Sequence, residues 1–379
     1  MNSRLTRVVA VAASLVTMLV ASAAAHAAPG MEVGLQDDAV FLYQNYYNRD
    51  VALQQARQLG VTRLRVNVLW DRIAAAEAGQ TTPPATVTYN WAPYDSLVDA
   101  AAASGIKVQF SIAGPAPAWA NAKRQHNLHA GAYKPNPALY GRFVHDVAQH
   151  FAGRVDRYSI WNEPNWKGWL APLKSAPQQY AKLFKAGYAA VKSVDPNAKV
   201  LFGELAPQER RGASIAPLTF IRQALGKRGR IVADGFAHHP YAFTVSPTSK
   251  KGGPNDVTMG TLGRLTKLLR GLAKAHRLRT PQGGSLPLYL TEYGYFARGP
   301  RALGEGRRTA YLKKGFEMAM RNPSVREMVQ YTLVAPPGNV PWDTSLIGTN
   351  GAPSAAFNSL SKWATGAIGA GRISALPKL

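Results

Sequence analysis

Short apolar segments alternate with helical segments along most of the chain. Eight of the apolar segments are six to eight residues long, and most are rich in Val, Leu and Ile. Segments of this length and composition are typical of buried strands. We therefore predict strands at residues 31–36, 62–69, 106–112, 155–161, 198–203, 231–237, 286–291 and 327–333.

A helical pattern follows each predicted strand. Apolar residues recur every three or four positions in these stretches, and several of them begin at Pro or Asp and end before Gly. We expect Asp50 to cap the first helix and Gly60 to end it. The predicted helices cover residues 50–59, 94–103, 137–151, 177–194, 217–225, 262–276, 307–321 and 353–363.

This alternation predicts the fold class. Eight strands and eight helices, with no linker or change in composition between them, predict a single α/β domain of the (β/α)8 TIM-barrel type. A doubly wound open sheet is the main alternative. That fold favours a Gly-rich phosphate-binding loop after the first strand, whereas residues 34–38 contain a single glycine.

The first 27 residues have the features of a cleaved signal peptide. Arg4 and Arg7 precede an apolar stretch at residues 8–20, and Ala25 and Ala27 are small residues of the kind that signal peptidase recognises. We expect a secreted protein, extracellular, periplasmic or associated with the cell wall, with a signal peptide at 1–27, a (β/α)8 domain at 28–365 and a short tail at 366–379. No other apolar stretch predicts a membrane span.

Composition excludes some chemistry and suggests the charge of the partner. The chain has no cysteine, which excludes thiol catalysis and thiolate-bound metals. Its 45 Lys and Arg outnumber its 21 Asp and Glu, and loss of the two leader arginines lowers the formal charge from +24 to +22. Because no nucleic-acid-binding motif accompanies this charge, we expect no nucleic acid partner. An anionic polysaccharide is compatible with it, and general adaptation to the habitat is the alternative.

Two glutamates follow the predicted strands four and seven. They are Glu163, in the segment 159–165, and Glu292, in the segment 290–295. Catalytic groups of a TIM barrel lie at the carboxyl ends of its strands, so both carboxyl groups should face one substrate. Hydrolysis of a glycosidic bond requires such a pair, about 5–5.5 Å apart in retaining enzymes and about 6.5–9.5 Å apart in inverting ones. Taken alone, a glutamate at a strand end is usually part of a loop salt bridge.

Three polar residues are candidates to support this pair. Arg65 interrupts an apolar strand, and an Arg buried in a barrel requires a carboxylate partner, for which Glu292 is the candidate. Tyr241, after strand six, is placed to donate a hydrogen bond to the same carboxylate. Asn162 directly precedes Glu163 and is a candidate ligand for a sugar hydroxyl group.

These motifs resemble those of clan A glycoside hydrolases. Residues 161–165, Trp-Asn-Glu-Pro-Asn, are similar to the clan's strand-four motif, and residues 291–294, Thr-Glu-Tyr-Gly, to its strand-seven motif. Arg65 and the His-Pro-Tyr segment at 239–241 resemble its strand-two arginine and strand-six His-x-Tyr. The branch that holds families 5 and 39 is the most similar, over residues 32–364. The resemblance implies a TIM barrel in which Glu163 is the acid/base and Glu292 the nucleophile.

The aromatic residues depart from this pattern after strand eight. Enzymes of the clan usually present a Trp there as a floor for the sugar, whereas here Tyr331 lies in the strand and Trp342 follows only later. Which residue forms the floor is therefore open. Trp119 and Trp342 are candidate platforms for sugar rings, with packing in the core as the alternative.

Two further residues near the predicted strand ends carry ionisable groups. His239 is expected to donate into the pocket rather than bind a metal, because neighbouring strand residues such as His238 face opposite sides. Glu204 follows strand five, and we expect it to pair with Arg210 or Arg211.

The sequence thus predicts a secreted, monomeric, retaining O-glycosyl hydrolase. It would cleave a poly- or oligosaccharide, with an anionic one as a candidate, through a covalent glycosyl-enzyme, with no cofactor and no metal. A catalytically weak or inactive carbohydrate-binding barrel, or an adhesin, retained on anionic polymers is the alternative, and a transglycosylase would share every residue named. The sugar, its linkage and endo or exo action depend on the loops at 113–135, 165–177 and 243–256.

Overall fold

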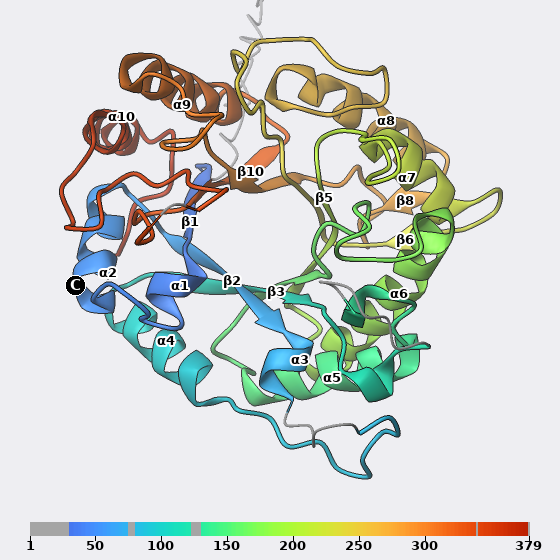
Figure 1. Ribbon diagram of the computed structural model, residues 1–379. Coiled ribbons are helices and arrows are strands. Elements are labelled where there is room, and N and C mark those ends of the chain that lie inside the picture. The colour runs from blue at the N-terminus through green and yellow to red at the C-terminus, as the bar shows by residue number, and fades with distance from the viewer. Residues whose placement is uncertain (1–29, 75–79, 123–129, 339, 378–379) are drawn as a thin grey trace, which may run out of the picture.

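Eight parallel strands close into a barrel, as the alternation predicted (Figure 1). The computed structural model describes residues 30–74, 80–122, 130–338 and 340–377, so the predicted signal peptide lies outside the described residues. Neighbours around the ring follow the order β1-β2-β3-β4-β5-β7-β9-β10, and β10 pairs with β1. These strands are β1 (Glu32–Gln36), β2 (Arg63–Leu69), β3 (Lys107–Ala113), β4 (Arg157–Ile160), β5 (Lys199–Leu205), β7 (Gly235–His238), β9 (Leu288–Tyr293) and β10 (Val325–Tyr331).

Helices surround the ring of strands (Figure 1). The eight predicted helices correspond to α2 and α4–α10, and the short helices α1 and α3 are additional. Within the described ranges, no helix is both long enough and apolar enough to cross a membrane. The bounds are α1 (Asp38–Phe41), α2 (Arg49–Gln58), α3 (Trp70–Ile73), α4 (Ala92–Ala103), α5 (Pro137–His150), α6 (Ala176–Val194), α7 (Pro217–Leu225), α8 (Leu262–Lys274), α9 (Glu305–Met320) and α10 (Ala355–Gly369).

The predicted strand at 231–237 is wrong as one element. Ile231–Val232 (β6) pairs with Leu278–Arg279 (β8) in a separate two-stranded sheet, and the barrel strand β7 begins at Gly235. Asp234 separates the two segments. Its backbone N–H donates to the Val200 carbonyl oxygen and its carboxylate accepts from the Val200 N–H, both at 2.9 Å. These bonds fix the chain against β5 before the barrel strand starts.

Two expectations about helix ends are also wrong. Asn48 rather than Asp50 caps α2, because its side chain accepts a hydrogen bond from the Val51 N–H at 3.0 Å. The last helix continues to Gly369 instead of ending at residue 363, so the expected boundary at residue 366 falls inside α10. Ile373 then pairs with Met31 at the start of the barrel, and both side chains are buried. The segment up to residue 373 therefore packs with the barrel.

The core has an apolar part, between strands and helices, and a polar part inside the barrel. One large cluster of buried apolar side chains fills the space between strands and helices. Inside the barrel, Arg157 forms ion pairs with Glu32 at 2.6 Å and Glu327 at 3.3 Å, and Gln109 donates to Glu327 at 3.0 Å. Buried charges are stable only when paired in this way. The ring of strands is thus packed on both faces and can position side chains at its carboxyl end.

Candidate active site

Glu163 lies in a strained turn after β4. The backbone enters the left-handed region at Trp161 (φ 69°) and again at Glu163 (φ 36°). Such angles cost a non-glycine residue about 1–3 kcal/mol and persist where surrounding contacts enforce them. Here the Trp161 N–H donates to the Ile112 carbonyl oxygen at 2.8 Å, and its indole N–H donates to the Trp169 carbonyl oxygen at 2.9 Å. These bonds hold the turn that carries Glu163.

Glu292 lies at an irregular point of β9 and has two hydrogen-bond donors. The register between β9 and β10 shifts between Leu290 and Tyr293. Arg65 Nη1 donates to Glu292 Oε1 at 2.9 Å, and Tyr241 Oη donates to Glu292 Oε2 at 3.0 Å. Both predicted contacts are therefore confirmed. Because each carboxylate oxygen has its own donor, the orientation of the Glu292 side chain is fixed.

The two glutamates face each other across a short gap. One carboxylate oxygen of each, together with a ring nitrogen of His239, lies within 4.8 Å of the others. The side chains keep some exposure, 17% for Glu163 and 12% for Glu292. This spacing agrees with a carboxyl pair separated by about 5–5.5 Å. It is closer to that value than to the separation of about 6.5–9.5 Å that leaves room for a water molecule between substrate and base.

A bulge in β5 turns Glu204 into the barrel. Gly203 pairs with Ala237 and Leu205 pairs with His238, so Glu204 is the extra residue, with φ at 50°. Gly203 has a φ of 126°, and a Cβ atom there would approach the Ala237 carbonyl oxygen to 2.3 Å. Only glycine suits that position. Bulges redirect side chains in this way, often next to functional sites.

The prediction that Glu204 pairs with Arg210 or Arg211 is therefore wrong. Its buried carboxylate accepts a hydrogen bond from Arg65 Nη2 at 3.0 Å and lies 2.6 Å from His239 Nε2. Burial alone would raise the pKa of Glu204, but the charge of Arg65 and the hydrogen bond from His239 lower it to about 2. Glu204 is thus a permanent anion beside the catalytic candidates.

His239 connects this anion to the glutamate pair. Its Nδ1 lies 3.0 Å from Glu163 Oε1 and 3.6 Å from Glu292 Oε2, while Nε2 faces Glu204. Burial disfavours a charged ring, yet the charge of Glu292 and the hydrogen bonds to Glu163 and Glu204 raise the pKa of His239 to about 10. The imidazolium can then donate to Glu163 and Glu204 at once. His239 lies in the pocket, with each ring nitrogen facing a carboxylate.

Glu163, His239 and Glu292 also have the spacing of three metal ligands. A histidine binds a metal through a neutral ring, however, and the raised pKa of His239 keeps both ring nitrogens protonated at neutral pH. The buried guanidinium of Arg65, 2.9 Å from Glu292, adds a second positive charge at the same point. Both glutamates of this trio thus already have a positively charged neighbour.

Glu204→Gln removes the buried anion without changing the size of the side chain. Arg65 and His239 then lose a counter-charge inside the barrel, so we expect the free energy of unfolding to fall by about 3–5 kcal/mol. Urea denaturation followed by tryptophan fluorescence measures this change. The matched control is Glu317→Gln on α9, whose pair with Lys313 spans 3.8 Å at the surface, and we expect about 0–1 kcal/mol there. Equal losses in the two variants would contradict the structural role given to Glu204.

Aromatic side chains form a hollow of about 100 Å³ next to Glu163. Trp342 lies in it and contacts Tyr241 edge-on, with ring centroids 5.3 Å apart. Phe243 and Trp166 line the same hollow. Of the two tryptophans predicted as platforms, Trp342 is therefore the one that lies beside the glutamate pair.

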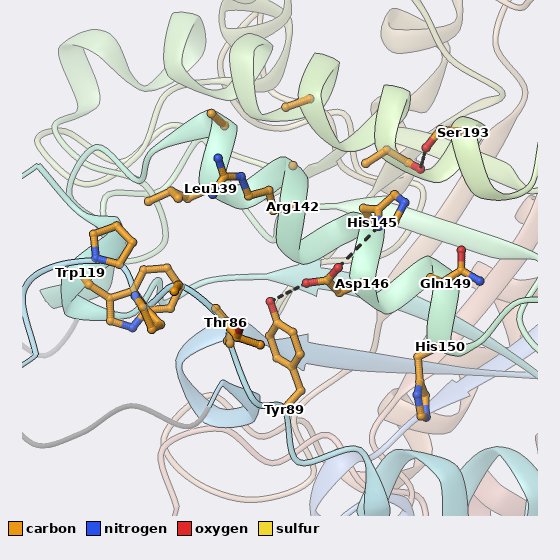
Figure 2. A pocket seen from close by; sticks show the side chains of 18 of the residues that line it. Thr86, Tyr89, Trp119, Leu139, Arg142, His145, Asp146, Gln149, His150 and Ser193 are labelled. Atoms are coloured by element: carbon orange, nitrogen blue, oxygen red, sulfur yellow. Dashed lines mark hydrogen bonds and ion pairs between the residues drawn. The ribbon is translucent and has the colours of Figure 1, made fainter.

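Trp119 lies elsewhere. Its side chain is 5% exposed and contacts Trp70 edge-on at 5.7 Å, which is packing in the core. It also borders a separate open cavity of about 940 Å³ between α5, α6 and residues 83–91, shown in Figure 2. The acid in that cavity, Asp146, accepts a hydrogen bond from Tyr89 at 3.0 Å, and no second carboxylate lines the cavity. The larger cavity therefore lacks a carboxylate pair.

Asn162 and the ends of β1 and β2 add polar groups to the site. Asn162 Oδ1 accepts from Arg65 Nη2 at 2.9 Å, which leaves its amide NH₂ group without a partner among the described residues. Gln36 accepts from Arg65 and donates to Asp38 at 3.3 Å, and Asn67 donates to Asp38 at 2.8 Å. Desolvation raises the pKa of Asp38 to about 6. Gln36, Asp38 and Asn67 were not predicted as site residues, although polar residues at the end of two apolar strands were a signal.

Comparison with known proteins shows the fold. No protein-family model matches the sequence, and no curated protein matches it. A family 39 glycoside hydrolase from the gut symbiont Bacteroides cellulosilyticus WH2 is similar in structure, with a TM-score of 0.64 and 18% identity over 89% of this chain and 64% of that one. This chain thus spans less than two thirds of its length.

Two further solved structures are similar over most of this chain. A family 39 β-xylosidase from Caulobacter crescentus has a TM-score of 0.58 and 16% identity, over 90% of this chain and 73% of that one. Native xylanase 10B from Thermotoga maritima has a TM-score of 0.57 and 16% identity, over 90% and 97% of the two chains. Likeness at this identity supports the (β/α)8 barrel.

Proposed function

We propose that this chain is a retaining glycoside hydrolase in which Glu292 is the nucleophile and Glu163 the acid/base. The observation that carries the proposal is the pair of partly exposed carboxylates, whose oxygens lie within 4.8 Å at one end of the barrel. A loop salt bridge does not account for Glu163, because no Lys or Arg of the described residues lies within 4.0 Å of its carboxylate.

In the first step, the sugar would lie between the two carboxyl groups. Glu163 gives its proton to the glycosidic oxygen, an oxygen of Glu292 attacks the anomeric carbon, and the bond to the leaving group breaks. The leaving group departs as an alcohol and the sugar stays bound as an ester of Glu292. Arg65 and Tyr241 hold the attacking carboxylate in position at 2.9 and 3.0 Å.

In the second step, Glu163 acts as the base. It takes a proton from a water molecule, whose oxygen attacks the anomeric carbon, and the ester bond to Glu292 breaks. Two displacements at one carbon restore its original configuration. His239, 3.0 Å from Glu163, fixes the orientation of this carboxyl group in both steps.

The substrate class and the setting follow from the same proposal. The similar structures carry the names glycoside hydrolase, β-xylosidase and xylanase, which supports a poly- or oligosaccharide substrate here. Every group in the proposed steps is a side chain or water, so the mechanism requires no cofactor. We also propose export, on the basis of residues 1–27, and action as a monomer.

A substrate screen tests the proposed function. Purified protein is incubated with 4-nitrophenyl glycosides and with neutral and uronate-containing polysaccharides, and we expect turnover of at least one aryl glycoside and one polysaccharide. Glu292→Gln, purified in parallel, controls for contaminating enzymes. Retention of the protein on a polysaccharide affinity gel without turnover of any substrate would contradict the proposal and favour the carbohydrate-binding alternative.

A further inference from the structure

Two arginines lie against the aromatic side chains at this hollow: Arg210 lines it, and Arg301 stacks on Trp342, which lines it. The Arg210 guanidinium lies 5.4 Å from the Phe243 ring centre, and the Arg301 guanidinium lies 4.0 Å from the Phe296 ring and 5.2 Å from the Trp342 ring. Phe243 and Trp342 are 6.3 Å apart, and Trp342 and Phe296 are 4.9 Å apart. The two cations therefore flank one continuous aromatic surface.

The loop that carries Arg210 is held in place from the active site. Asn165 Nδ2 donates to the carbonyl oxygens of Ala206 and Ile215, both at 2.9 Å, and so closes the loop between them. Within it, the Arg210 N–H donates to Ser214 Oγ at 2.9 Å. Because Asn165 belongs to the turn of Glu163, the position of Arg210 is coupled to the catalytic candidate.

Arg301 is held through a second contact between loops. Arg298 forms an ion pair with Asp343, which connects the loop after β9 to the loop that carries Trp342. Arg298 Nη2 also donates to the Pro336 carbonyl oxygen at 2.6 Å. Arg301 thus stacks on Phe296 and Trp342, and the Arg298–Asp343 ion pair connects the two loops that carry these rings.

Both arginines lack a counter-charge. No Asp or Glu oxygen of the described residues lies within 4.0 Å of the Arg210 or Arg301 guanidinium, whereas Arg63, Arg65 and Arg157 each have such a partner. Desolvation and then the charge of Arg210 lower the pKa of Arg301. Two like charges near each other on an apolar surface are unfavourable, and a bound anion would relieve the repulsion.

The hollow lies on the side of the leaving group. Glu163 lines it and Glu292 does not. In a retaining mechanism the acid must face the glycosidic oxygen that departs, while the nucleophile approaches the other side of the anomeric carbon. A sugar in this hollow is therefore the one released first, with Trp342, Phe243 and Trp166 as its apolar contacts.

We propose that this hollow is a subsite for an acidic sugar, and that Arg210 and Arg301 bind its carboxylate. Guanidinium groups match the geometry of a carboxylate and form charge-assisted hydrogen bonds with it. The substrate would be a poly- or oligosaccharide with a uronic acid directly after the cleaved bond. This inference rests on the proposed function and goes further by naming the charge of the leaving group. In this proposal two arginines, and not the basic surface as a whole, determine the specificity for an anionic substrate.

A pair of disaccharides tests the subsite. Both contain the sugar that the screen shows to be cleaved, linked in one to glucuronic acid and in the other to its methyl ester. We expect wild-type kcat/KM to be at least about tenfold higher for the acid, since one charged hydrogen bond contributes about 1.5–3 kcal/mol. In the double variant Arg210→Gln, Arg301→Gln this ratio should fall toward one. Arg270→Gln, an exposed site on α8, is the control and should keep the ratio.

Two outcomes would contradict the proposed subsite for an acidic sugar. One is a wild-type ratio near one, and the other is a ratio that the double variant retains. Circular dichroism of both variants verifies that they are folded. The proposed hydrolase function stands or falls with the substrate screen. If the wild type cleaves neither disaccharide, calorimetric affinities for the same two compounds decide the subsite. Tighter binding of the acid that is lost in the double variant supports it, and equal affinities contradict it.

Discussion

Glu292→Gln should lower kcat by about 10⁵-fold or more, the scale on which loss of a catalytic nucleophile acts. The amide keeps the size of the side chain and an oxygen that can accept the 2.9 Å hydrogen bond from Arg65. It cannot form the ester with the anomeric carbon, so the first displacement stops. Steady-state rates on the aryl glycoside identified by the screen measure the effect.

The matched control is Glu317→Gln, the same substitution on the outer helix α9. Its rate should equal that of the wild type within about twofold, because surface substitutions away from the site rarely change stability by more than about 0.5 kcal/mol. A Glu292→Gln enzyme that keeps a tenth of the wild-type rate, with the control unchanged, would contradict the assignment of the nucleophile.

Glu163→Gln should reduce kcat/KM by about 10²–10⁴-fold for the natural substrate, whose leaving group must be protonated as it departs. An activated aryl glycoside needs no such help, since its phenolate leaves unprotonated, and its kcat/KM should change by less than about tenfold. The comparison requires only initial rates of one variant on two substrates. Equal losses on both substrates would show that Glu163 is not the acid.

An external nucleophile tests the role of Glu163 as the base of the second step, separately from its role as the acid of the first. In the Glu163→Gln enzyme, water lacks its base, so the glycosyl-enzyme formed from the activated substrate should accumulate. Azide attacks without a base and should restore kcat for this substrate. Absence of rescue would mean that the variant is blocked before the intermediate forms, against the role given to this residue.

The fold was predictable because its signals are local. Each barrel strand is a short apolar segment and each covering helix a periodic one, and their alternation leaves few topologies open. Glu163, Glu292 and Tyr241 could be found because strand ends of a barrel converge. Arg65 could be paired with Glu292 because a cation in an apolar strand needs a carboxylate.

The rest depends on contacts between distant segments. The bulge that aims Glu204 at Arg65 is one extra residue in the pairing of β5 with β7. Gly203 is a local sign of a bulge, but it does not say which residue the side chain of Glu204 meets. Asp234 splits the predicted sixth strand through hydrogen bonds to Val200, on another strand. Trp119 has the position of a platform in the sequence, but its contact with Trp70 places it in the core.

Charge was also only partly predictable. The excess of 45 basic over 21 acidic residues suggests an anionic partner without saying which cations meet it. In the structure, internal ion pairs neutralise the charges of Arg63, Arg65 and Arg157. Arg210 and Arg301 have no acidic partner among the described residues and stack on aromatic rings near Glu163, a distinction that requires side-chain positions.

Peptide mapping of a trapped intermediate tests the central claim most directly. The wild-type enzyme is incubated with an activated 2-deoxy-2-fluoro glycoside of the sugar found in the screen, whose fluorine slows the second step. We predict that the intact mass rises by one fluoroglycosyl unit and that fragmentation of the digested protein places this unit on Glu292. A label on any other side chain, or turnover of the reagent with no labelled protein, would contradict the account.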